Sequence, residues 1–222
     1  MLKTYARFIA LATGVAAALA FAYWGYVAHQ KRQLQQTALE LVQDSTARLG
    51  EALGLLTAGP EARRRLESSF TALEADVRRL ASQDASLNPP LVRAAEAYIT
   101  DVHAILRRQL AAHQARDAVR ADMAEIAEHL RSDRGRSEDW IRQALALKQR
   151  LERNFFDYRF AAGGLEKSFK SLRDSRAGFE PFKLPVVVIE ERALAKANEQ
   201  LLAASARLTP EVENARKLPL PR

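Results

Sequence analysis

Histidines and carboxylates are the side chains of this chain that could hold a catalytic metal, and their spacing tests that chemistry. A carboxylate-bridged metal pair in a helical bundle needs Glu and His at positions i and i+3 on facing helices. The motif is missing each time, because the residues three positions before the four histidines are Tyr26, Thr100, Leu110 and Ile126. The chain also has no cysteine, which excludes disulfides and thiolate metal sites. We therefore expect no metal and no cofactor, with surface or boundary positions for His29, His103, His113 and His129.

Motifs for nucleophilic catalysis and phosphate binding are missing as well. No serine lies in a G-x-S-x-G sequence, the turn that exposes the nucleophile of many hydrolases. Gly163-Gly164 is not a phosphate loop, because it lacks the preceding strand of a P-loop and no Lys with Ser or Thr directly follows the second glycine. We interpret the glycine pair as a point of close helix packing or a bend. The sequence therefore predicts a protein that is not an enzyme.

Apolar residues repeat with near-heptad spacing along a helix expected over residues 91–131, and they form a seam on one side of it. Gln109 and Arg116 are polar residues at positions of this seam. One interpretation is a buried polar layer that fixes register or forms a ligand pocket, since an unpartnered buried charge costs several kcal/mol. The other interpretation is that the seam opens there and the long Arg116 side chain reaches water. We expect the second arrangement, and a carboxylate beside the guanidinium would favour the first.

An uncharged apolar run, Phe8 to Ala28, precedes all of these residues. As a helix it rises about 31 Å, which matches the hydrocarbon thickness of a bilayer. A cleavable signal peptide is the alternative, with Ala18-Leu19-Ala20 as an acceptable cleavage site. We expect a retained anchor, because aromatic and then basic residues follow the apolar run as they do at a membrane interface. These interface residues are Tyr23, Trp24, Tyr26, Lys31 and Arg32.

The cations on the two sides of this run are nearly balanced, so they leave its orientation open. Because the stretch before the run is too short to carry a domain, we expect it to stay in the cytoplasm. The sequence then predicts a single-pass protein of the bacterial inner membrane with its body in the periplasm.

Glycine, proline and turn residues divide that body into helical segments. The breaks are Gly59-Pro60, Asn88-Pro89-Pro90, Ser132 to Gly135 and Gly178 to Pro185. Apolar residues in the segments repeat with near-heptad spacing, which is typical of coiled-coil-like packing. The predicted fold is all-α, with a transmembrane anchor over residues 1–28, an elongated up-down helical bundle over 29–208 and a tail over 209–222. The bundle helices are expected at about 29–58, 60–83, 91–131, 137–175 and 186–206.

Aromatic residues are concentrated at the end of the fourth bundle segment and in the loop after it: Phe155, Phe156, Tyr158, Phe160, Phe169, Phe179 and Phe182. Phe156 and Phe160 lie off the seam on one helix face, and the loop after the helix carries two more aromatic residues. Exposed apolar residues gathered in this way mark interaction sites. The sequence therefore predicts an interaction patch made of Phe156, Phe160, Phe179 and Phe182.

The formal net charge is +7 at pH 7, but the arginine clusters are interleaved with acidic residues. We interpret them as solvated helix faces and expect no nucleic-acid partner. The layout resembles the sensory half of chemoreceptors and of helical histidine-kinase sensors, although no second span, signalling linker or output domain follows Leu208. We therefore expect a structural or accessory platform for another envelope protein or a homo-oligomer. The alternative is a helical module that binds a small molecule or peptide and relays it to a separate partner.

Overall fold

The computed structural model describes residues 2–56, 60–132, 137–182 and 189–217, with the side chains of residues 2–12 and of Pro60 excepted. Within these residues the chain is helical and contains no strand. Its five α-helices are α1 (Leu2–Gly54), α2 (Pro60–Ala81), α3 (Pro89–Arg131), α4 (Glu138–Ala177) and α5 (Glu191–Arg216). The prediction of an all-α helical bundle is confirmed.

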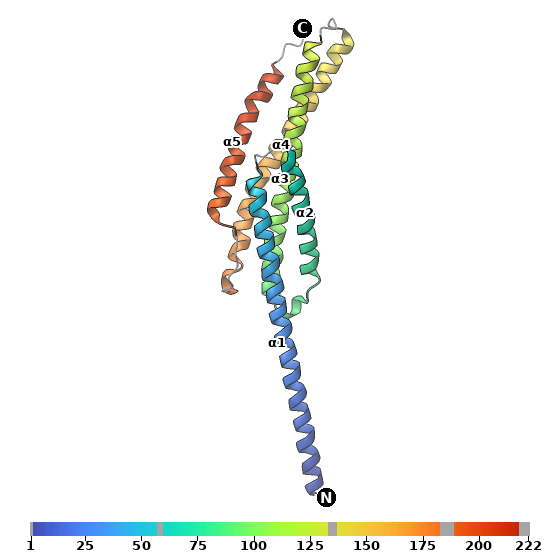
Figure 1. The fold of residues 1–222 in the computed structure, drawn as a ribbon, viewed down its shortest axis with the longest axis vertical. Coiled ribbons are helices and arrows are strands. Elements are labelled where there is room, and N and C mark those ends of the chain that lie inside the picture. Colours follow the sequence, from blue (N-terminus) through green and yellow to red (C-terminus); the bar gives the residue numbers. More distant parts are fainter. Residues whose placement is uncertain (1, 57–59, 133–136, 183–188, 218–222) are drawn as a thin grey trace.

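The helices alternate in direction along one long axis (Figure 1). The first helix, α1, extends from the N-terminus into the bundle, α2 returns beside it, and α3 runs past the end of α1. The fourth helix, α4, comes back along α3 over most of its length, and α5 then lies beside α4. The α3–α4 pair is the longest hairpin of the fold and forms the framework on which the other helices pack.

Polar caps explain where the two long helices begin. The Asn88 side chain accepts a hydrogen bond from the Leu91 amide at 3.5 Å, and two prolines occupy the first turn of α3. The Ser137 hydroxyl accepts one from the Trp140 amide at 3.3 Å, and acidic residues in the first turn of α4 complement the helix dipole. Both helices therefore begin within two residues of the predicted positions.

The two ends of the chain depart from the predicted segments. The predicted anchor segment and the first predicted bundle helix are one continuous helix that ends at Gly54, four residues before the predicted end. The last helix, α5, begins at Glu191 and continues to Arg216, so the predicted helix end at residue 206 and the tail from 209 are wrong. Residues 186–188 and 218–222 lie outside the described residues, as do residues 133–136, which include most of the predicted break at Ser132 to Gly135.

The extension of α5 passes through Pro210, which has no amide hydrogen to donate. Leu208 and Val212, on either side of it, are both buried in the core. The Thr209 hydroxyl donates to the Ser205 carbonyl at 2.8 Å and supplies one local hydrogen bond. Burial of two aliphatic side chains offsets the lost backbone bond, since each contributes about 1.5–3 kcal/mol.

Heptad-spaced side chains form the core, as the sequence predicts. On α4 the seam runs without interruption across Gly163-Gly164, so the glycine pair does not end the helix. The buried members of this seam are Leu151, Phe155, Tyr158, Ala162, Leu165, Phe169 and Leu172.

Polar side chains fix the register of the α3–α4 hairpin. The buried carboxylate of Asp122 accepts from Arg150 Nε at 2.6 Å and from Asn154 Nδ2 at 2.7 Å. Farther down the hairpin, Asp101 accepts hydrogen bonds from Ser171 and Ser175. Because charge-assisted hydrogen bonds of this kind are strong and directional, a sliding of α4 along α3 would break both groups of contacts.

Candidate functional site

The first half of α1 extends away from the bundle as an isolated helix (Figure 1). Every side chain from Thr13 to Tyr26 is exposed, and Phe21 is 82% exposed; the first fully packed residue of the helix is Leu34. The predicted interface residues are all exposed: Tyr23, Trp24 and Tyr26 lie in this stretch, and Lys31 and Arg32 lie just after it. No helix in the described part of the chain is long and apolar enough to cross a membrane. The side chains of Phe8 to Ala12, which belong to the predicted span, lie outside the described residues.

Phe156 and Phe160 form an exposed aromatic pair on α4. Their side chains are 67% and 77% exposed, and the rings stack with centroids 6.5 Å apart and planes 18° apart. The predicted four-residue patch is nevertheless wrong, because Phe179 is buried and Phe182 is half-buried against the core. Phe179 contacts Tyr98 edge to face at 5.8 Å, beyond the end of α4. Of the four residues of the predicted patch, only Phe156 and Phe160 are therefore exposed.

A groove of about 820 Å³ lies beside Phe160, between α3 and α4. Small residues form much of its floor, and its lining contains no carboxylate. Its cations are Arg107, Arg108, Arg159 and Lys167. The sequence interpretation of Arg107-Arg108 as an ordinary solvated face missed this groove, which two distant segments form together.

Three polar side chains of α3 cap the end of α1. Gln109 Nε2 donates to the Ala52 carbonyl, and Arg116 Nη1 donates to the Leu56 carbonyl at 3.5 Å. Arg116 Nη2 contacts His113 Nδ1 at 2.9 Å, and Arg116 Nε lies 3.9 Å from Asp117 Oδ1. The Ala52 carbonyl lies in the last turn of α1, where carbonyls have no partner within the helix, and Leu56 follows the helix end, so this group supplies donors that α1 itself lacks. We call Gln109, His113 and Arg116 the α1 end cap.

The end cap shows that the interpretation of Arg116 as a side chain reaching water is wrong. Arg116 is only 7% exposed, Gln109 is fully buried, and Asp117 is the carboxylate that the alternative required. Burial lowers the pKa of Arg116, the neighbouring Arg120 lowers it further, and Asp117 raises it. Because an arginine guanidinium stays protonated in proteins, Arg116 acts as a buried cation with donors only.

His113 is the buried member of the four histidines, against the expectation of a surface or boundary position. It is 3% exposed, and its Nδ1 must accept from the Arg116 guanidinium, so the ring is neutral. Burial is the main cause that lowers the pKa of His113 below 6.5, and the Arg116 charge lowers it further. Asp117 and the Leu55 carbonyl act in the opposite direction.

This lowered pKa predicts a pH-dependent stability. Between the folded and unfolded pKa values of His113 the unfolded chain binds more protons than the folded chain. The stabilising contribution of neutral His113 is therefore fully present above about pH 6.5 and is lost as the pH falls through the folded pKa. Each unit of difference amounts to about 1.4 kcal/mol. We expect His113→Gln to flatten the fall in unfolding free energy between neutral and acidic pH, measured by urea denaturation. The matched variant at exposed His29, His29→Gln, should keep the wild-type slope; an equal slope in both variants would contradict the prediction.

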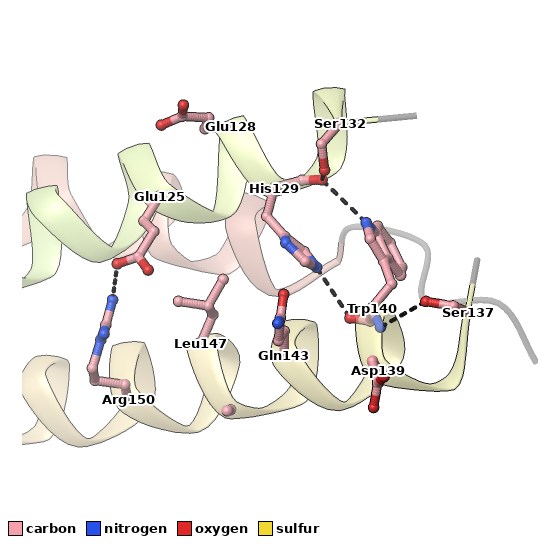
Figure 2. A pocket seen from close by; sticks show the side chains of 11 residues that line it. Glu125, Glu128, His129, Ser132, Ser137, Asp139, Trp140, Gln143, Leu147 and Arg150 are labelled. Carbon is pink, nitrogen blue, oxygen red and sulfur yellow. Dashed lines mark hydrogen bonds and ion pairs between the residues drawn. The ribbon is translucent and has the colours of Figure 1, made fainter. Parts of the chain in front are cut away.

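A second pocket, of about 670 Å³, lies at the tip of the α3–α4 hairpin (Figure 2). His129 and Trp140 stack there at 4.7 Å, His129 Nε2 donates to the Trp140 carbonyl at 3.0 Å, and Trp140 Nε1 donates to the His129 carbonyl at 3.3 Å. Arg150 reaches Glu125 across the same pocket. These groups join the two helices to each other, which indicates a structural role in closing the hairpin.

The described residues contain no cluster of side chains that could bind a metal ion. No group of three or more His, Cys, Asp or Glu side chains is placed there to hold an ion. His103 stacks on Phe70 at 4.5 Å, and burial lowers its pKa, with Arg107 adding to the effect and Glu74 opposing it.

The chain matches no model of a known protein family, no curated protein and no solved structure.

Proposed function

We propose that this chain is a single-pass, membrane-anchored helical bundle that acts as an interaction platform for an envelope complex. Residues 8–28 form the anchor, the protein lies in a bacterial inner membrane, and the bundle lies in the periplasm. Its partner is another envelope protein or a second copy of the chain. The observation that carries the proposal is the exposed, apolar first half of α1.

The distribution of apolar residues around α1 supports a lipid environment for its first half. A helix that contacts one protein partner is apolar on one side, whereas a helix that is apolar all round is surrounded by protein or by lipid. From Thr13 to Ala28 no charged residue appears on any side, and the exposed aromatic residues cluster before Lys31. Lipid accounts for both features without a second protein that encloses the helix.

The packing of the bundle favours the function of an interaction platform rather than that of a ligand-binding module. Large core side chains such as Leu41, Leu66 and Leu165 have no exposed surface. The groove beside Phe160 and the pocket at the hairpin tip both lie at helix surfaces, and most of the residues that line them are exposed. A surface with an exposed aromatic pair beside a cationic groove suits contact with another macromolecule.

Extraction and protease experiments test the anchor and its orientation together. We expect the chain to stay in the membrane fraction after alkaline carbonate extraction, and protease added to spheroplasts to digest the body from Gln30 onward. Leu19→Arg places a charge in the middle of the span and should shift protein to the soluble fraction, because a central arginine is costly in a bilayer.

The matched control is Leu202→Arg, which makes the same change at an exposed leucine of α5 and should leave the membrane fraction unchanged. Full release of the wild-type chain by carbonate, or a mature chain beginning at Phe21, would contradict the anchor. Protection of the body in intact spheroplasts would contradict the orientation.

A further inference from the structure

The cations of the groove beside Phe160 lack internal counter-charges. Some surface arginines elsewhere on the bundle are paired with a carboxylate, as Arg216 is with Glu152 at 3.8 Å. Within the described part of the chain, no ion pair forms to Arg107, Arg108, Arg159 or Lys167, and the groove lining holds no carboxylate. Like charges gathered on one surface repel each other, so an anionic partner would be favoured there.

The floor of the groove is shaped for close approach of another chain. Arg108 lies across Gly164 and donates to its carbonyl, and a Cβ on Gly164 would come within 2.5 Å of the Arg108 Nη1 atom. Beside it, a Cβ on Gly163 would meet nothing within 4 Å, so this part of the helix surface is open. Ala104 of α3 and Ala161 of α4 also line the groove, and their side chains are short. A peptide backbone can therefore approach α4 closely at Gly163, and the missing Cβ of Gly164 leaves room for the Arg108 guanidinium.

The aromatic pair gives the same surface an apolar anchor. Phe160 lines the groove, and Phe156 continues its exposed face one turn earlier on α4. Aromatic and arginine side chains together are typical of the residues that contribute most binding energy at protein interfaces. The groove thus suits a partner with apolar and acidic side chains on adjacent faces.

The position of the groove distinguishes a protein partner from a lipid surface. Gln109, adjacent to Arg108 in sequence, bonds to Ala52 of α1, so the groove lies level with that residue. Ala52 is about 36 Å along α1 from the end of the proposed span at Ala28, at 1.5 Å per residue. This step rests on the proposed function. Since charge interactions are screened over about 8–10 Å at physiological salt, headgroups of the anchoring membrane are too far away to neutralise the groove.

We propose that the groove between α3 and α4 beside Phe160 binds an acidic, amphipathic peptide segment of a partner protein. Carboxylates of the segment pair with Arg107, Arg108, Arg159 and Lys167, and its apolar face packs on Phe156 and Phe160.

Fluorescence anisotropy with the full chain in neutral maltoside micelles tests the proposal. The probe is a labelled amphipathic helical peptide with glutamates along one face and leucine and phenylalanine along the other, and its glutamine counterpart is the control peptide. We expect the double variant Arg107→Glu with Arg159→Glu to raise the Kd for the glutamate peptide at least about tenfold. The matched double variant, Arg93→Glu with Arg153→Glu, makes the same charge change at exposed cations outside the groove and should change the Kd less than about twofold.

Three results would overturn the proposal. These are equal affinity for the two peptides, an equal effect of the two double variants, and no measurable binding of the glutamate peptide. Two further measurements identify other occupants, and either positive result would also overturn it. One is flotation of the chain, held in phosphatidylcholine nanodiscs, with phosphatidylglycerol vesicles, where the flotation is lost in the variant Arg107→Glu with Arg159→Glu. The other is self-association of the chain without peptide that the same variant abolishes. Peptide binding in micelles does not require insertion into a membrane, so a failure of the anchor and a failure of the groove are separate results.

Discussion

Phe155→Ala is expected to lower the free energy of unfolding by about 3–5 kcal/mol, the cost of truncating a buried phenylalanine in a packed core. Phe155 is 5% exposed, lies on the α4 seam, and has the Arg216 guanidinium 5.7 Å from its ring centroid. The cavity left by the substitution would remove contacts within the core and this contact with α5. Phe156→Ala, one residue along the chain, should cost less than about 1 kcal/mol, because its ring loses mainly the contact with Phe160.

Urea denaturation followed by circular dichroism checks this pair of variants, since both remove the same atoms from adjacent positions. The comparison also decides whether the aromatic pair is available for a partner. If Phe156→Ala destabilised the chain as much as Phe155→Ala, the Phe156 ring would belong to the core, and the apolar anchor of the groove would lose its basis. If both variants were nearly neutral, the register of α4 in the bundle would be wrong.

The helices and their seam could be predicted from the sequence because both depend on local patterns. Near-heptad spacing places apolar residues on one side of a helix, and that side must be buried. Asn88 and the prolines after it mark the start of α3 for a reason that is also local, the need of the first amides for partners. The unbroken seam across Gly163-Gly164 likewise predicts the continuous helix that α4 forms.

The departures arise where a distant segment changes the environment of a residue. Pro210 suggests an end for the last helix, but packing of Leu208 and Val212 into the core maintains the helix beyond it. Phe179 is in a turn, where an exposed aromatic residue is a reasonable expectation, yet Tyr98 of α3 covers it. Neither contact is visible in the spacing of nearby residues.

The cationic groove could not be predicted for a related reason. Arg108 and Gly164 are 56 residues apart and meet only because α3 and α4 pair in one particular register. Near Arg107-Arg108 in the sequence, acidic residues suggest local neutralisation, whereas no carboxylate lines the groove. Charge counted along a chain therefore describes a helix, but not the surface that two helices form together.

The second large effect is expected at the α1 end cap. Arg116→Leu should lower the free energy of unfolding by about 2–4 kcal/mol, because the Leu56 carbonyl and His113 Nδ1 each lose a donor and an unsatisfied buried group costs about 1–3 kcal/mol. Replacement of a whole buried ionic group by apolar residues can be neutral, but this substitution leaves the partners of the arginine in place. The loss should therefore exceed any gain from the apolar side chain.

Arg120→Leu is the matched control, because Arg120 lies one turn farther along α3 and is exposed; its cost should stay within about 0.5 kcal/mol. The double variant Arg116→Leu with His113→Leu separates the contributions, since it removes the orphaned ring nitrogen together with its donor. Coupling between the two sites should make the double variant less destabilised than the sum of the single variants. Additive costs would show that the contact between Arg116 and His113 contributes nothing to stability, and a neutral Arg116→Leu would show the same for the whole guanidinium. A deficit that persists in the double variant would then be assigned to the end of α1, where the Leu56 carbonyl still lacks a donor.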